Sequence, residues 1–198
     1  KSGIIKDGGD VVLYPGQPEV ETVVERICKE RNANLRKADF DKVDLLSHSL
    51  KGQTFRYGEL VLELPLLGHH QLCNAAMALQ IIATLREKNW NISGKDICDG
   101  IRDVSWPGRF DIVKKDPLFI IDGGHNPQCI DALVTNIRDY LADKRIIALT
   151  GVLADKDYGE MFRPVMDLVE QFAKRVIAID DGLVISDGLD GYYTYENQ

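Results

Sequence analysis

The stretch "FIIDGGHNP", Phe119 to Pro127, passes from an apolar run to an acid, two glycines, a histidine and an asparagine. The apolar run predicts a strand that ends at Asp122, and Pro127 suits the first turn of a following helix. The two glycines permit a close backbone approach or a positive φ. Such a strand-to-helix turn indicates either a ligand-binding site or a capped turn in which Asp122 accepts a local hydrogen bond.

The residues on both sides of this turn alternate between apolar runs and amphipathic stretches. Strand–helix–strand repetition implies a parallel sheet with right-handed crossovers, and ligands of such sheets lie at the carboxyl ends of the strands. We therefore expect an α/β domain that begins near Ser105. Its expected strands and helices are Phe119–Asp122, Pro127–Leu141, Arg145–Thr150, Tyr158–Ala173 and Arg175–Asp180.

The residues before Ser105 predict a second set of elements. Apolar positions at helical spacing indicate helices, and short apolar runs next to Gly or Pro indicate strands. Ser93 and Asp96 stand at the spacing of a capping box. The expected elements are a strand at Val11–Tyr14, a helix at Pro18–Ala33, a hairpin turning at Tyr57–Gly58, a buried helix at His69–Arg86 and a short helix after Ser93.

Composition restricts the function classes. The net charge of -7 argues against a nucleic-acid-binding protein, whose footprint would be basic. The four cysteines lack CxxC spacing, which favours reduced thiols in a cytoplasmic protein. No apolar run reaches the ~20 residues of a membrane span, and no signal peptide is evident. The chain begins at Lys1 without a methionine, so we expect a fragment.

Several polar residues outside the turn are candidates for binding. Arg109 follows a Trp-Pro-Gly corner and could hold phosphate through its planar fork, or be a surface arginine. Gln71 and Asn74 lie in the first turns of an apolar helix, where an amide could contact a nucleobase or cap the helix. Lys156, between two acids, could hold a carboxylate or belong to a solvated charge cluster. For the adjacent His69 and His70 no third metal ligand stands at suitable spacing, which favours a structural role.

Taken in order, "LLGHHQLCNAAMAL", "WPGRF", "IIDGGHNP" and "GVLADKD" resemble the folylpolyglutamate synthase/dihydrofolate synthase family of the Mur ligase superfamily. The family patterns read roughly G-x-H-Q-x-x-N-A, W-P-G-R, D-G-A-H-N-P and G-x-x-x-D-K-D. Gly124 replaces the usual alanine, and "KSGIIK" is similar to E-K-A-G-I-I-K without its glutamate. The resemblance extends to about Asp180.

The resemblance implies two structural parts. Residues 1–104 would be the C-terminal part of the P-loop ATPase domain, the Mur ligase central domain, and residues 105–198 a Rossmann-like C-terminal domain with a parallel-type sheet. No G-x-x-G-K-S/T P-loop occurs in the sequence. The implied partner is therefore the missing N-terminal P-loop portion of the same enzyme.

The resemblance also implies a reaction and site residues. ATP, with Mg²⁺, would phosphorylate the carboxylate of a folate or of dihydropteroate, and the amine of L-glutamate would attack the acyl phosphate. Asn74 would contact adenine, Arg109 the phosphates and Asp122 the ribose or its surroundings, while His125 would lie by the reacting phosphate. His125 and Arg109 are thus the expected catalytic residues.

Two lysines complete the implied site. Lys156 matches a lysine that holds the carboxylate of the incoming amino acid. Lys1 matches a lysine that is carbamylated and helps to bind a second Mg²⁺, since carbamylation turns a cation into an oxygen ligand.

Two alternatives stay open at this point: another Mur-type amino-acid ligase, and a non-catalytic nucleotide-binding or interaction module without an ATPase half. Neither nucleic acid nor a membrane is expected as a partner. A P-loop encoded before Lys1 would support an enzyme, and a natural start codon there would support the module.

Overall fold

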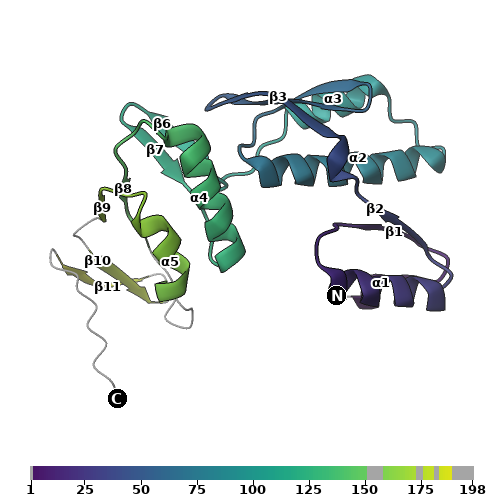
Figure 1. Ribbon diagram of the computed structural model, residues 1–198, viewed down its shortest axis with the longest axis horizontal. Coiled ribbons are helices and arrows are strands. Elements are labelled where there is room, and N and C mark those ends of the chain that lie inside the picture. Colours follow the sequence, from purple (N-terminus) through teal and green to yellow (C-terminus); the bar gives the residue numbers. More distant parts are fainter. Residues whose placement is uncertain (1, 151–157, 173–175, 181–182, 189–198) are drawn as a thin grey trace, which may run out of the picture. The chain divides into compact units, whose positions relative to one another are not determined.

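The computed structural model describes residues 2–150, 158–172, 176–180 and 183–188 (Figure 1). Contacts between Cα atoms divide the chain into two compact units, Lys1–Gly123 and Gly124–Gln198. The two units are described one after the other. The domain boundary expected near Ser105 stays a prediction.

The first unit begins with a small parallel sheet and one helix. After a 3-10 helix at Ser2–Ile4, strand β1 (Asp10–Leu13) leads into α1 (Pro18–Glu30), and β2 (Asn34–Lys37) returns parallel to β1. β1 and α1 were expected from the sequence, and β2 was not. β2 pairs in a register that places Arg36 within 3.0 Å of the Asp10 carboxylate.

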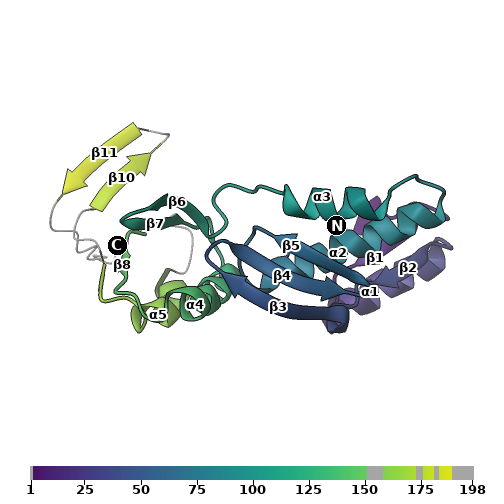
Figure 2. The same cartoon turned by 90° about the horizontal axis from the view of Figure 1, so that it is seen from above.

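The core of the first unit lies between an antiparallel sheet and two helices (Figure 2). After a 3-10 helix at Phe40–Lys42, strands β3 (Val43–Ser49), β4 (Gly52–Tyr57) and β5 (Leu60–Leu64) pair in sequence order. The expected turn at Tyr57–Gly58 joins β4 to β5, with Gly58 at φ +59°. Helices α2 (His69–Glu87) and α3 (Gly94–Arg102) contribute side chains to the core, whose buried members are Phe55, Leu62, Leu64, Leu72, Ala75, Leu79, Ile97 and Ile101.

A hairpin ends the first unit. Strand β6 (Asp111–Lys115) pairs antiparallel with β7 (Leu118–Ile121), and a cis Asp116–Pro117 peptide lies in the turn. The strand expected at Phe119–Asp122 is therefore present, shifted by one residue. Its observed partner is β6, which the sequence did not predict because alternation is weak in "DIVKK".

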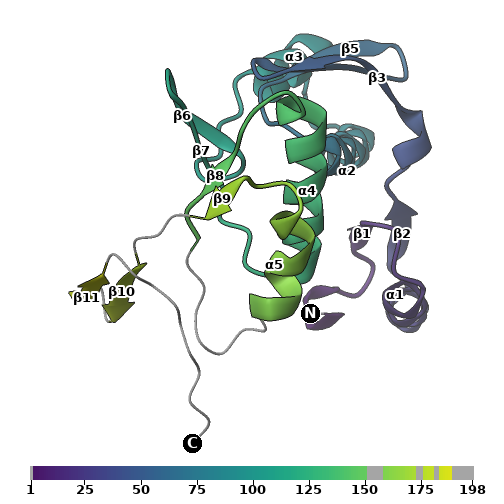
Figure 3. The ribbon, with the colours of Figure 1, turned by 60° about the vertical axis from the view of Figure 1, so that its left-hand side comes forward.

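The second unit contains one parallel strand pair joined through a helix, and the second strand of this pair lies where the sequence predicted helix. Helix α4 (Pro127–Leu141) precedes β8 (Ile147–Ala148), α5 (Tyr158–Met166) and β9 (Gln171–Phe172), and β8 and β9 pair in parallel (Figure 3). Helices α4 and α5 pack through Ile130, Val134 and Val165. The two strands β10 (Val176–Asp180) and β11 (Leu183–Gly188) form an antiparallel pair.

Two details of the second unit differ from expectation. The helix expected over Tyr158–Ala173 ends at Met166, and Gln171 and Phe172 form strand β9 instead. The strand expected at Arg175–Asp180 is present as β10, but its described pairing is antiparallel. The α/β class is confirmed, with both parallel and antiparallel pairs.

No helix in the described part of the chain combines the length and the hydropathy that crossing a membrane requires.

The capping box of α3 offers a test of local stability. The Ser93 hydroxyl accepts from the Asp96 amide at 3.1 Å, and the Asp96 carboxylate accepts from the Ser93 amide at 2.7 Å. Ser93→Ala is expected to lower the free energy of unfolding by ~1 kcal/mol, since it leaves a helix amide without its partner. Ser93→Thr keeps the hydroxyl as donor and acceptor and should stay near the wild-type value. Denaturant titration measures the free energy of unfolding of the wild type and of both variants. Equal values for all three proteins would contradict the prediction.

Candidate functional site

The start of α2 is held in place from the neighbouring sheet. Gly68 precedes the helix with φ +102°, a conformation that an L side chain rarely adopts. The buried Gln53 side chain of β4 donates to the carbonyls of Leu66 and Gly68, at 2.7 and 3.2 Å. The direction in which α2 leaves the sheet is therefore fixed by a residue that the sequence did not single out.

Asn74 lies exposed on the second turn of α2, and its orientation is set by Gln71. The Asn74 side-chain amide donates to the Gln71 carbonyl oxygen at 3.1 Å, and Gln71 itself is only 7% exposed. The N-cap residue of α2 is Gly68, which has no side chain to act as a cap. The Asn74 amide group is held at the surface by Gln71, and both the capping and the nucleobase interpretation stay predictions.

A second cluster at this helix end involves Tyr14, His69 and Cys73. The ring nitrogen Nε2 of His69 lies 3.6 Å from Cys73 Sγ, one helical turn away. Burial, together with the adjacent Cys73, raises the pKa of Tyr14 to about 12, and the Tyr14 hydroxyl is hydrogen-bonded to Cys73. Burial also raises the pKa of Cys73, so this thiol stays protonated at neutral pH. The cluster joins the end of β1 to α2.

The Trp-Pro-Gly-Arg-Phe corner is fastened to the residues that follow β7. Gly108 and Phe110 both have positive φ, +75° and +49°. The Phe110 amide donates to Asp122 Oδ2 at 2.9 Å, and the Gly123 amide donates to the Gly108 carbonyl at 2.8 Å. Asp122 therefore accepts a hydrogen bond from the backbone of this corner, twelve residues earlier in the chain.

The pKa of His70 responds to charged residues from two other sequence motifs, those that contain Arg109 and Asp122. His70 is half-buried, and burial is the main cause that lowers its pKa. The negative charge of Asp122 opposes this shift, while Arg109 and His69 add to it. His70 therefore lies within electrostatic reach of both Arg109 and Asp122, and the direction of the shift keeps its imidazole neutral at pH 7.

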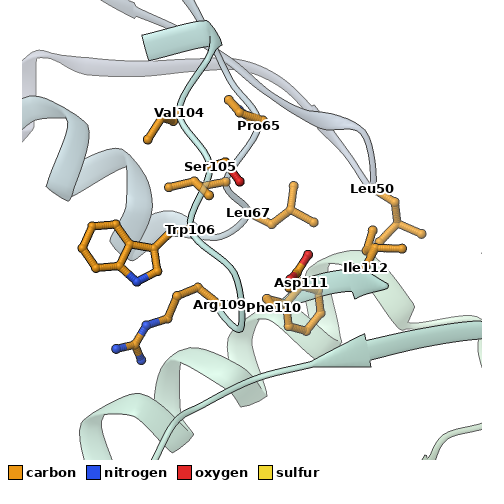
Figure 4. Close-up of a pocket in the computed structure, with 11 residues that line it drawn as sticks. Leu50, Pro65, Leu67, Val104, Ser105, Trp106, Arg109, Phe110, Asp111 and Ile112 are labelled. Carbon is orange, nitrogen blue, oxygen red and sulfur yellow. The ribbon is translucent and has the colours of Figure 1, made fainter. Parts of the chain in front are cut away.

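A pocket of about 200 Å³ lies against the corner (Figure 4). Its polar lining comes from Ser105, Arg109 and Asp111, and the rest is mainly apolar. In Figure 4 the Arg109 side chain extends beside Trp106, away from the apolar side chains of Leu50 and Ile112. Trp106 is 62% exposed, so this end of the corner presents an aromatic face and a cation to the surroundings.

His125 and Asn126 follow the division between the two units. The Asn126 side chain caps α4 by accepting from the Cys129 amide at 2.9 Å. His125 is exposed. The turn interpretation thus has direct support at Asn126, and the catalytic role expected for His125 stays a prediction.

The other two site predictions fall on Lys1 and on Lys156 in the "GVLADKD" segment, and both lie outside the described residues. Across the described ranges, no group of three or more His, Cys, Asp or Glu side chains is arranged to hold a metal ion.

The sequence did not predict Gln53, Phe110 and Asp111 as parts of this region. A lone glutamine in a strand carries no signal of its own. The positive φ of Phe110 could not be expected, since bulky residues seldom adopt it. Asp111 accepts from the Gly108 amide at 3.1 Å. The sequence carried no signal for this bond, because aspartates in turns usually accept from amides that follow them in the chain.

Comparison with known proteins gives matching results for sequence and structure. Residues 108–191 match the family described as "Mur ligase, glutamate ligase domain". The folylpolyglutamate synthase of Lacticaseibacillus casei is 34% identical over 169 residues, 81% of this chain and 39% of the relative. A folylpolyglutamate synthase structure from Thermotoga maritima has a TM-score of 0.72 at 30% identity, over 86% of this chain and 41% of that one. A structure titled "FPGS-AMPPCP-folate complex" has a TM-score of 0.74 at 28% identity, over 86% and 43%.

Residues 108–191 thus match the glutamate ligase domain of Mur ligases. Over most of its length the chain is similar to the C-terminal portion of folylpolyglutamate synthases and dihydrofolate synthases. It spans 39% of the length of the Lacticaseibacillus casei relative and 40% of that of the Bacillus subtilis relative.

Proposed function

We propose that this chain is part of a cytoplasmic, ATP-dependent ligase that adds L-glutamate to a folate or to dihydropteroate. The observation that carries the proposal is that two separate motifs are joined by hydrogen bonds. The Phe110 amide, next to Arg109, donates to Asp122 Oδ2 at 2.9 Å, and the Gly123 amide donates to the Gly108 carbonyl at 2.8 Å. The similarity to a structure titled as a complex with AMPPCP and folate supports the same ligands here.

In the proposed reaction a carboxylate oxygen of the folate attacks the γ-phosphorus of ATP, and the bond to the ADP oxygen breaks. The amine of glutamate then attacks the carbonyl carbon of the acyl phosphate, phosphate leaves and the amine loses a proton. Catalysis of such a transfer consists mainly of positioning and of neutralising charge on the phosphoryl oxygens.

Three described residues have proposed contacts with ATP. The guanidinium of Arg109 suits the phosphates, because its fork donates two parallel hydrogen bonds to oxygens. Asn74 suits adenine, since its amide is exposed and held by Gln71. Asp122, at the carboxyl end of β7, is the proposed residue at or near the ribose.

The remaining assignments rest on the family resemblance. His125 is proposed to face the reacting phosphate, Lys156 to hold the carboxylate of glutamate and Lys1, as a carbamate, to bind Mg²⁺. The described residues contain no cluster suited to a metal, so we derive no step through Mg²⁺ from them.

The proposal is tested with the complete gene product that contains these residues. ATP, Mg²⁺, L-glutamate and a reduced folate are supplied, and the glutamylated product and ADP are measured together. Dihydropteroate in place of the folate tests the second activity. Formation of amide only with other amino acids would favour another Mur-type ligase, and nucleotide binding without any amide would favour the non-catalytic module.

We expect His125→Ala to lower turnover at least tenfold, which corresponds to about 1.4 kcal/mol of barrier. The affinity for ATP should change less, because the adenine and ribose contacts are assigned to Asn74 and Asp122. The melting temperature should barely change, because the His125 side chain is exposed. Steady-state kinetics and a melting curve measure all three quantities.

Gln128→Ala, an exposed change in the first turn of α4, is the matched control and should leave turnover unchanged. Unchanged turnover in His125→Ala, or a large fall in its melting temperature, would favour the capped-turn interpretation instead.

A further inference from the structure

We propose that Asp122 is a positioning residue for Arg109: its carboxylate holds the backbone of Phe110 in a left-handed conformation and so fixes the corner that carries the arginine. The inference rests on the proposed function, because it gives Asp122 a second role in phosphate binding, one that acts through Arg109.

The first observation is the backbone of Phe110. A bulky residue with φ +49° is an outlier that persists only where its surroundings hold it. The Phe110 side chain is 4% exposed, so its ring is packed, and its amide donates to Asp122 Oδ2 at 2.9 Å. A charged acceptor makes this bond stronger than one between neutral groups.

The second observation is that Arg109 is held on both sides. The Gly108 amide donates to the Asp111 carboxylate at 3.1 Å, and the Gly108 carbonyl accepts from Gly123 at 2.8 Å. Phe110 is held by Asp122. The residues before and after Arg109 therefore each have a fixed partner, and two of the three bonds come from the consecutive residues Asp122 and Gly123.

The third observation concerns the space at Gly123. A Cβ atom there would lie 3.3 Å from the Gly108 carbonyl oxygen, which is closer than most such contacts. The glycine after Asp122 thus allows the close approach of the two backbones that places Phe110 within reach of the carboxylate. Asp122 and Gly123 can therefore hold the backbone of the corner in place and can also contact a ligand.

The two roles of Asp122 predict different results. A contact with the ribose would matter for ATP and not for inorganic tripolyphosphate, which has no ribose. A positioning role through Arg109 would matter for both ligands. It would also depend on the hydrogen-bond acceptor more than on the charge, so asparagine should substitute better than alanine.

The experiment compares Asp122→Ala, Asp122→Asn, Arg109→Ala and the double variant Asp122→Ala/Arg109→Ala in the complete gene product. Asp139→Ala, an exposed aspartate of α4, is the control. Amide exchange at Phe110 is measured by mass spectrometry, and binding of ATP and of tripolyphosphate by calorimetry. We expect Asp122→Ala to speed exchange at Phe110 at least tenfold, and to weaken both ligands at least fivefold. Asp122→Asn should restore most of both effects, and Asp122→Ala should add little to Arg109→Ala, as expected for residues that act as a unit.

Unchanged exchange at Phe110 in Asp122→Ala would overturn the inference. So would loss of ATP binding with tripolyphosphate binding intact, or additive losses in the double variant. If Asp122→Ala does not fold, the positioning role is tested with Asp122→Asn. A strong loss of tripolyphosphate binding in that variant, without faster amide exchange at Phe110, would contradict the positioning role. Failure of the wild-type protein to bind ATP would count against the proposed function, whereas exchange at Phe110 tests the hold on the corner separately.

Discussion

Replacing Arg109 with alanine is expected to lower kcat/KM in the complete enzyme by on the order of 2–4 kcal/mol in transition-state terms, by analogy with the loss of an oxyanion donor. The reason is that Arg109 is the proposed positive partner of the phosphate oxygens, on a corner whose backbone is held at Gly108 and Phe110. Steady-state kinetics with ATP as the varied substrate measure the effect. The loss should appear in turnover as well as in KM, because charge on the oxygens changes during the transfer.

Arg138→Ala is the matched control for this prediction. Arg138 is exposed near the C-terminus of α4, where its positive charge interacts favourably with the helix dipole. It should change kcat/KM by less than a factor of two, on the order of 0.4 kcal/mol. Equal losses in Arg109→Ala and Arg138→Ala would defeat the assignment of Arg109 to the phosphates.

The 198-residue chain alone is expected to form no glutamylated product above background. The physical reason is that no G-x-x-G-K-S/T loop occurs in it, and such a loop supplies the backbone amides and the lysine that hold the β- and γ-phosphates. Without them, the phosphate contacts proposed for this chain would not hold the transferred group in line for attack. The purified chain is assayed with ATP, Mg²⁺, L-glutamate and a reduced folate, with product detected by mass spectrometry.

The complete gene product, purified in the same way, is the positive control for that assay. ATP binding by the isolated chain is a separate measurement, and we expect it to be weak but detectable through the contacts proposed for Asn74 and Asp122. Amide formed by the isolated chain at a rate comparable to the complete product would contradict the prediction. It would mean that these residues alone hold the triphosphate.

The positions of the longer helices could be predicted from the sequence. His69–Arg86 and Pro127–Leu141 were expected, and α2 and α4 cover these residues with at most one residue of difference. The capping pair Ser93 and Asp96 was also recognisable. In each case the signal lies within a few turns of one helix, where periodicity and caps act on neighbouring residues.

The pairing of the strands could not be predicted in the same way. The sequence did not predict β2, β3, β6, β9 or β11. β7 was expected next to a parallel strand, whereas its described partner is the antiparallel β6. Short strands carry few residues on which alternation can be recognised. Their pairing also depends on a partner whose register is decided by packing, as at Asp10 and Arg36.

The sequence by itself determined the family resemblance, through four motifs, and the positions of the helices that carry or follow these motifs. Only the tertiary structure showed that Asp122 accepts from Phe110 and that His70 lies in the field of both Asp122 and Arg109. The physical reason is that a cap or a helical face involves residues within one or two turns of each other. A hydrogen bond across twelve residues, or a charge acting across more than fifty, exists only after the chain has closed on itself.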